Sequence, residues 1–375
     1  MAKLHIDIQG QAGVTEELTK EDISTLASCV DKVDDESDVR GSVHADVAYG
    51  QDVQKVRERF PDLELNVDVA GIHFEDPEVE RILLASTAIN PNKDEIITFE
   101  EAENVTGISV DMFYNNKLIE KFNEFRYFSK VKTTGFAVNP DRGNFQGCTA
   151  LKEITLPDEF NAFGRNMFIG CSNLESVKCN NDKITSIGML AFVYCSKLTM
   201  DIYFPNLTSL GQAPFYGARC KRVLSLGKVT NLPCWQGGGN GIFQGNTNLE
   251  YMHLPATLTR IEEQGFRSCS KLKIIVCDAS VPPTFTSWMG YDGLSGLKYV
   301  FVPSGSIENS TDDDGNTVQG YKSKWGFASS KTYAIGGTEW QTVAQEEAEK
   351  ESVDVSGMEL SDANIFEYIY THLPE

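Results

Sequence analysis

Phenylalanine recurs in one local pattern of apolar and polar positions through the middle of the chain. The run "FQGCTALKEITLP" begins at Phe145, and "FIGCSNLESVKCN" begins 23 residues later at Phe168. Four further copies follow at gaps of 24, 23, 28 and 23 residues. Their phenylalanines are Phe192, Phe215, Phe243 and Phe266. A fixed period in the twenties is typical of a solenoid, in which each repeat buries its apolar face against its neighbours.

Each repeat contains one predicted strand. In "LKEITLP" the first, fourth and sixth residues are apolar, which places Leu151, Ile154 and Leu156 on the inward face. The next segment, "FNAFGRNMFIGCSN", supplies a second apolar row made of Phe160, Phe163, Phe168 and Cys171. One strand per repeat, stacked in register, predicts a parallel sheet along one face of the repeats.

Two more positions follow the phenylalanine period. A cysteine stands three residues after the phenylalanine in four of the six copies. A leucine stands six residues after it in every copy except one, where Lys221 replaces it. We interpret the cysteines as reduced packing residues, because the chain has nine of them, an odd number, and no C-x-x-C motif.

The segments on either side of the repeats have other patterns. The start contains an alternating strand, "KLHIDIQ", and a helix, "TKEDISTLASCVDKV", which Thr19 is placed to cap. Strand, helix and strand are expected over 42–70, helices over 74–87 and 98–108, and an exposed hairpin or loop over 304–320. We therefore divide the chain into an attachment segment 1–41, an α/β capping region 42–130, repeats with their closure 131–337, and an acidic helical tail 338–375.

The repeat sequences resemble the BspA-like leucine-rich repeat family, whose pattern is L-x-x-I-x-I-P-x-x-V-x-x-I-G-x-x-A-F-x-x-C. "LKEITLPDEFNAFGRNMFIGCSN", "ITSIGMLAFVYCSKL" and "LTRIEEQGFRSCSKL" match it, and the resemblance covers about 130–335. It implies a right-handed leucine-rich-repeat solenoid with short parallel strands. The fourth repeat is five residues longer than the others, which indicates a bulged loop at 234–241. Members of the family are mostly surface or secreted adhesion-type proteins of gut and oral bacteria, and some are encoded by phages.

Charge and hydropathy exclude several partners. The net charge is −21, and residues 1–105 alone carry 25 acidic and 9 basic side chains. Phosphate binding needs a basic surface, so nucleic acid is not an expected partner. No apolar run reaches the roughly 20 residues that a membrane span needs, so we expect no membrane insertion.

The family often has a calcium-like loop before its repeats, and "NPNKDEIITFEE" at 90–101 aligns with it. Its ligand positions hold Asn90, Asn92, Asp94, Thr98 and Glu101. An aspartate at the first position and a glycine at the sixth are absent, so we expect a structural loop without metal.

"CWQGGGNG" has no following Gly-Lys-Ser/Thr and is not a phosphate loop. The five histidines are scattered, and we expect neither a cofactor nor catalysis.

The outward residues of the predicted strands are the candidate binding residues. Taking the third and fifth residue of each strand as outward, we also place Val223 and Ser225 there in the fourth repeat. The candidates are Tyr203, Tyr251, His253, Ile274, Val276, Tyr299 and Phe301. Such an apolar patch is seldom left in water. Either a partner or the chain's own segment "SDANIFEYIYTHL", with Ile365, Phe366, Ile369 and Leu373 on one side, would cover it.

These features favour a non-catalytic protein-binding or assembly protein, whose expected partners include further copies of itself. The start, "MAKLHIDIQGQAGVTEEL", shows no export signal. We therefore expect a phage virion component, such as a fibre or capsid-associated protein assembled in the host cytoplasm. The alternative is an adhesin on the bacterial cell surface that binds host or neighbouring-cell proteins.

Overall fold

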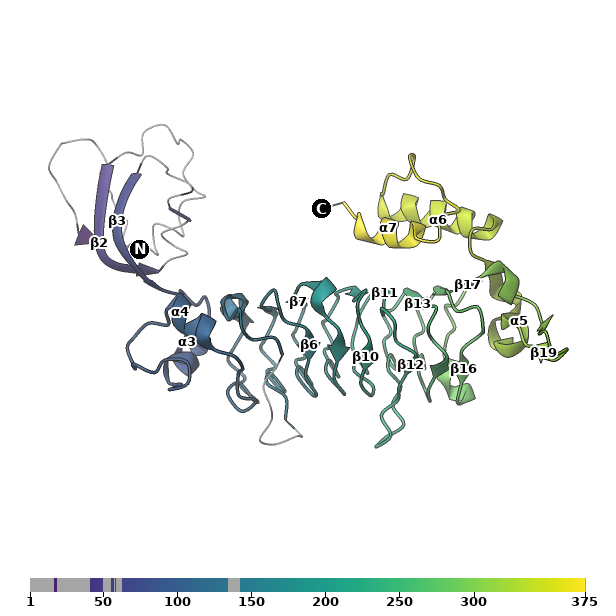
Figure 1. The fold of residues 1–375 in the computed structure, drawn as a ribbon, viewed down its shortest axis with the longest axis horizontal. Helices are drawn as coiled ribbons and strands as arrows, with labels where there is room; N and C mark the ends of the chain where they lie inside the picture. The colour runs from purple at the N-terminus through teal and green to yellow at the C-terminus, as the bar shows by residue number, and fades with distance from the viewer. Residues whose placement is uncertain are drawn as a thin grey trace. The chain divides into compact units, whose positions relative to one another are not determined.

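The computed structural model describes residues 17–18, 41–49, 55–56, 58, 63–133 and 142–374 (Figure 1). The strand and the helix expected within 1–40 lie outside these residues, and β1 (Glu17–Leu18) belongs to neither of them. The chain forms two compact units, one of residues 1–106 with 121–130 and one of 107–120 with 131–375.

The described residues of the first unit include a parallel sheet and short helices. β2 (Gly41–Tyr49) pairs with β1 and with β3 (Leu63–Gly71). α3 (Pro77–Leu84) begins after Asp76, whose carboxylate accepts hydrogen bonds from the first-turn amides. α4 (Phe99–Asn104) begins with a capping box formed by Thr98 and Glu101. β4 (Lys121–Phe122) and the 3-10 helix η2 (Asn123–Tyr127) also belong to this unit.

The second unit is the repeat solenoid, and its main strands are parallel and one per repeat. β5 (Glu153–Thr155) pairs with β7 (Ser176–Lys178). A six-stranded sheet follows in the spatial order β9, β11, β13, β15, β17 and β20. These strands are β9 (Ile202–Tyr203), β11 (Arg222–Ser225), β13 (Tyr251–Leu254), β15 (Ile274–Cys277), β17 (Tyr299–Val302) and β20 (Thr332–Ala334). The predicted parallel sheet is confirmed.

A second row of two-residue strands, which the sequence pattern did not predict, turns each repeat back. β6 (Ala162–Phe163), β8 (Ser186–Ile187) and β10 (Ser209–Leu210) form one parallel sheet. β12 (Asn231–Leu232), β14 (Arg260–Ile261) and β16 (Thr284–Phe285) form another. Short 3-10 helices, η3 (Asn181–Lys183) and η4 (Trp288–Tyr291), lie between strands.

The phenylalanines form a continuous stack through the core. From Phe113 to Phe243, the centroids of successive rings lie 5.3 to 5.6 Å apart. The cysteines line up beside them, and the Sγ of Cys171 donates to the carbonyl of Phe145 in the previous repeat. All the residues predicted to point inward are buried. The core of the repeats is therefore the one expected from the period.

The fourth repeat departs from the expected register. β11 pairs Arg222 with Tyr251 and Val223 with Met252, so Val223 is equivalent to an inward residue. Cys220, which is fully buried, occupies the place that leucine has in the other repeats. The expectation that Val223 and Ser225 point outward is wrong for Val223, because the strand begins one residue earlier. Arg222 and Leu224 lie on the outer face instead.

The C-terminal closure and the tail complete the unit. After η5 (Ser304–Ser306), β18 (Ser310–Thr311) and β19 (Thr317–Val318) form the expected exposed hairpin. α5 (Tyr321–Lys324) and η6 (Gly326–Lys331) lead into β20. The tail, residues 338–374, contains α6 (Thr338–Glu351) and α7 (Ile365–Thr371). Figure 1 shows both helices lying over the strands β11, β13 and β17.

Candidate interaction surface

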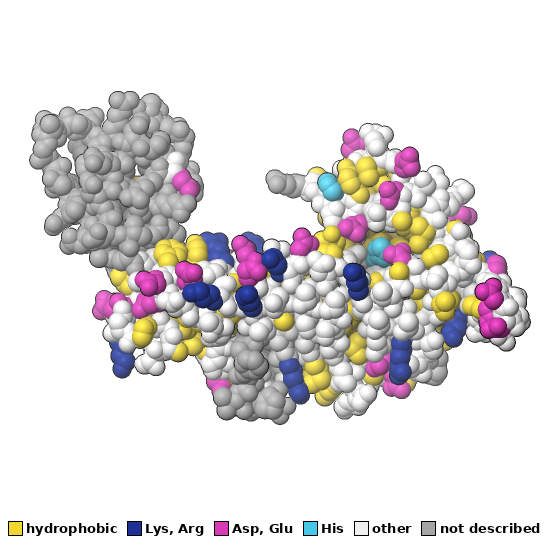
Figure 2. Space-filling view, viewed as in Figure 1, with side chains coloured by type: hydrophobic (Ala, Val, Ile, Leu, Met, Phe, Trp, Pro, Cys, Tyr) yellow, Lys and Arg dark blue, Asp and Glu magenta, His cyan; other side chains and the backbone are white. Residues whose placement is uncertain are grey.

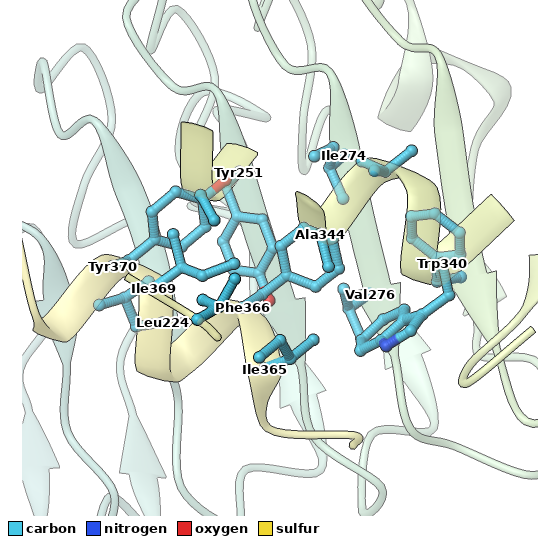
Figure 3. Packing of buried hydrophobic residues seen from close by; sticks show 14 residues of the cluster. Leu224, Tyr251, Ile274, Val276, Trp340, Ala344, Ile365, Phe366, Ile369 and Tyr370 are labelled. Carbon is cyan, nitrogen blue, oxygen red and sulfur yellow. The ribbon is translucent and has the colours of Figure 1, made fainter. Parts of the chain in front are cut away.

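We call the outward side of the main strands β5, β7, β9, β11, β13, β15 and β17 the outer sheet face. In its C-terminal half, one apolar cluster joins the sheet to the tail (Figure 3). The sheet contributes Leu224, Tyr251, Ile274, Val276 and Phe301. The tail contributes Trp340, Val343, Ala344, Ala348, Val355, Ile365, Phe366, Ile369 and Tyr370. The chain's own tail therefore covers the apolar half of this face.

Pairs of aromatic rings join the sheet to the tail within the cluster. The Tyr251 ring lies 4.8 Å from that of Tyr370 and 5.7 Å from that of Phe366. Phe301 meets Trp340 edge to face at 5.1 Å, and Trp340 meets Phe366 at 4.7 Å. Edge-to-face and offset pairs at these distances are favourable beyond the area that they bury.

The spacing of the buried tail residues explains why two helices form there. In α6 the buried residues Trp340, Val343, Ala344 and Ala348 follow the period of a helix with one apolar side. In α7 they are Ile365, Phe366, Ile369 and Tyr370. Leu373, which we expected on this side, is instead exposed, because α7 ends at Thr371.

The structure brings the seven candidate residues onto this one face. Tyr251, Ile274, Val276 and Phe301 are buried, while Tyr203 and Tyr299 are half-buried at the edge of the cluster. His253 places its Nε2 2.7 Å from Oδ2 of Asp278. Of the two expected covers, the tail is the one present in the structure. That these residues bind a separate partner stays a prediction.

Arg222 is the residue of this surface that the sequence did not reveal. Its Nη1 donates to Oδ2 of Asp201 at 3.1 Å, and its Nη2 donates to Oε2 of Glu351 in α6 at 2.7 Å. The guanidinium also lies 4.5 Å from the centre of the Tyr370 ring. Only 4% of the side chain is exposed. The positive charge is thus held between the sheet and the tail by two carboxylates and a ring.

Burial and the neighbouring charges act in opposite directions on the pKa values of Arg222, Asp201 and Glu351. Burial disfavours the charge of Arg222, but the attraction of Asp201 and Glu351 outweighs it and raises the Arg222 pKa. Burial raises the pKa of Asp201 despite the nearby guanidinium. For Glu351 burial is outweighed by the hydrogen bond from Lys350 and the attraction of Arg222, so its pKa is lowered.

Further polar contacts fix the tail at its edges. Tyr203 donates to Oε1 of Glu367 at 3.1 Å. Lys350 in α6 lies 3.6 Å from Glu250, which comes just before β13. Figure 2 shows hydrophobic side chains gathered where the tail meets the sheet. The contact between the tail and the sheet therefore has an apolar centre, with charged and hydroxyl groups around it.

The tail cluster does not include the residues of β5 and β7. In this N-terminal half of the outer sheet face, Thr155 and Ser176 are half-buried and Lys178 is exposed. Tyr203 lies at the border, since it is half-buried and packs against the cluster. The outer sheet face thus has an apolar half under the tail and a polar half outside the cluster.

The loop at 90–101 uses its polar groups locally. Nδ2 of the buried Asn90 donates to the carbonyl of Asp94, and Nδ2 of Asn92 donates to the Asp94 carboxylate. Glu101 accepts from Thr98 in the capping box of α4. Across the described residues, no group of three or more His, Cys, Asp and Glu side chains is arranged to hold a metal ion. That the loop is independent of calcium stays a prediction.

The glycine-rich segment at 234–241 is a hairpin. Trp235 pairs with Asn240 in an antiparallel bridge, and the Trp235 ring lies against Gly237 and Gly238, where a Cβ would meet it at 2.9 to 3.0 Å. The glycines are explained by this contact, and the segment is the bulged loop expected at 234–241.

In the part of the chain that is described, no helix has the length and apolar character needed to cross a bilayer.

Comparison with known proteins identifies the repeats. The model of the BspA type leucine rich repeat region matches residues 141–234 and 238–305, in six copies. No curated protein matches the chain. One similar solved structure is a leucine-rich repeat protein from Bacteroides ovatus ATCC 8483, with 23% identity, a TM-score of 0.33, and coverage of 46% of this chain and 43% of that one. The chain therefore spans less than half the length of that protein.

A second similar structure is a leucine rich cell surface protein from Faecalibacterium prausnitzii A2-165. It has 15% identity, a TM-score of 0.22, and coverage of 53% of this chain and 76% of that one. The six matched copies identify residues 141–234 and 238–305 as BspA type leucine-rich repeats.

Proposed function

We propose that the protein is a non-catalytic binding solenoid that recognises a protein partner through the polar half of its outer sheet face. The observation that supports this is the division of that face. The tail buries the apolar half, and β5 and β7 are not part of the tail cluster. A partner would therefore meet Ser176, Lys178 and the edge of Tyr203.

The chemistry of this half suits a protein surface. Stacked repeats offer an extended binding surface, because neighbouring strands present their side chains in rows. Tyrosine is enriched at interfaces between separately folded proteins, and polar side chains such as these are typical of the rim of an interface.

For the setting we propose attachment to a larger body, either a bacterial cell surface or a phage particle. The BspA-like family is mostly associated with surfaces, and one similar protein is described as a cell surface protein. The finer assignment to a virion component stays a prediction. Antibody labelling of intact cells and of purified phage particles distinguishes the two, because only one of these bodies would be labelled.

Site-specific cross-linking tests the binding face. A photoreactive residue replaces Lys178 on β7, and the matched control replaces the exposed Arg260 on β14, in the second row of strands. We expect one cross-linked protein from position 178 and not from position 260. Affinity for that protein, once purified, should fall at least tenfold with Lys178→Glu and remain unchanged with Arg260→Glu. Equal cross-linking at both positions, or equal affinities, would contradict the proposed face.

A further inference from the structure

The tail is joined to the repeats through a short glycine-containing segment. Ile335 still belongs to the sheet side, since its amide donates to the carbonyl of Val302 at 2.9 Å. Gly336 has a φ of +76°, which glycine adopts without the strain that a side chain would cause. Gly337 then stands directly before α6. The tail is thus a separate layer attached at one point of the chain.

The apolar surfaces of the tail and the sheet complement each other over a wide area. Five sheet residues and nine tail residues form one buried cluster, in which Val276, Phe301, Trp340 and Phe366 are completely buried. Helix-in-groove recognition uses buried residues at the same helical spacing as those of α6 and α7. The sheet face has the properties of a docking site for an amphipathic helical segment.

The polar contacts select this particular segment. The tail supplies carboxylates, Glu351 and Glu367, to the Arg222 guanidinium and the Tyr203 hydroxyl of the sheet. Glu250 of the sheet side meets Lys350 of the tail. Opposite charges at such positions set the register and orientation of a bound segment. A helix of different charge pattern would leave Arg222 buried without its second carboxylate.

We propose that this face also binds the tail of a second copy of the protein, so that two copies can exchange tails. Every copy has the segment whose fit to the face is seen in the structure, and exchange in both directions gives a closed symmetric pair. The short connection gives the chain's own tail an effective concentration on the order of millimolar. The closed single chain therefore prevails in dilute solution, and exchange becomes populated where copies are crowded together.

A complementation experiment with two full-length variants tests the exchange. The acceptor has Trp340→Ser and Phe366→Ser, so its tail is defective and its sheet face is intact. The donor has Tyr251→Ser and Ile274→Asp, so its face is defective and its tail is intact. All four residues lie in the tail–sheet cluster. We expect each variant alone to sediment as a monomer, and an equimolar mixture to contain a one-to-one complex.

The control is a mixture of the acceptor with a donor that also has the two tail substitutions, which should contain no complex. A mixture of folded acceptor and donor that sediments only as monomers would overturn the proposal. Circular dichroism and a cooperative melting transition establish folding. If either variant does not fold, a fluorescent peptide of residues 338–374 is added to the wild-type chain at millimolar concentration. Saturable binding supports the exchange, and its absence overturns it. The proposed function, which concerns β5 and β7, is tested separately at Lys178.

Discussion

Nη2 of Arg222 donates a hydrogen bond of 2.7 Å to Oε2 of Glu351, although 129 residues separate the two in the chain. This contact joins the fourth repeat to the tail helix α6. Both side chains are largely buried, with 4% and 12% of their surfaces exposed. The pair therefore ties the tail to the fourth repeat.

Replacing Arg222 should weaken the attachment of the tail. In Arg222→Met, Asp201 and Glu351 lose their shared cation, and breaking a buried pair from one side costs about 3 kcal/mol. Glu351 retains Lys350 at 2.9 Å, which limits the loss. Urea unfolding measures the change, and Arg260→Met, at an exposed position, should stay within about 0.5 kcal/mol of the wild type. Equal stabilities for the two variants would show that the pair does not hold the tail.

The stability of the protein should depend on pH through Glu351. Its pKa in the folded state is below the ordinary value of 4.5. Its stabilising contribution is therefore complete above pH 4.5 and is lost as the pH falls through the folded-state pKa. Asp201 acts in the opposite sense, since burial raises its pKa.

The substitution Glu351→Gln isolates this contribution because it leaves Asp201 in place. The variant should be less stable than the wild type at pH 7, and the difference should shrink as the pH is lowered below 4.5. Thermal melting at a series of pH values measures it. A difference that stays constant from pH 7 to pH 3 would contradict the lowered pKa.

Phe192→Ala should destabilise the repeats by roughly 3–5 kcal/mol, the usual cost of emptying a buried aromatic site. Phe192 is fully buried, and its ring lies 5.4 Å from those of both Phe168 and Phe215. Tyr194→Ala is the matched control, because 54% of Tyr194 is exposed. Denaturant unfolding compares the two. A cost below about 1 kcal/mol for Phe192→Ala would mean that the phenylalanine stack is not the core.

The cysteines beside the phenylalanine stack should resist thiol reagents. Burial raises the pKa of Cys148 and of Cys269 to about 12. Only the thiolate reacts rapidly, so both residues should remain unmodified at pH 8 until the repeats unfold. Mass spectrometry after timed alkylation, with and without denaturant, locates the modified residues. Modification of Cys269 at the same rate in both conditions would contradict this packing.

The repeats could be predicted from the sequence because their evidence is local and periodic. Phe145 and Phe168 stand in nearly identical surroundings, and identical surroundings stack in register. The place of Arg222 could not be predicted in this way. It depends on a segment between Phe215 and β11 that is one residue shorter than the equivalent segment of the next repeat, and Lys221 was its only sign. A shift of one residue moves every side chain of a strand to the other face.

The sequence could not predict what covers the outer sheet face, for a different reason. The pattern of Tyr251, Ile274 and Phe301 shows that an apolar patch exists, and the pattern of Ile365 and Phe366 shows an amphipathic helix. Nothing in either pattern decides whether the two meet within one chain or between chains. That outcome depends on the path of the chain through Gly336, which brings α6 back over the sheet.

Hydroxyl-radical footprinting of the intact full-length chain tests most directly whether the tail covers the outer sheet face. Tyr251 and Phe301 are buried in the cluster, whereas Tyr194 is exposed and serves as an internal reference. We predict that Tyr251 and Phe301 are oxidised far more slowly than Tyr194, and that both become reactive when the chain is shortened to end at Gly337. Oxidation of Tyr251 and Phe301 in the full-length chain as fast as that of Tyr194 would contradict the account.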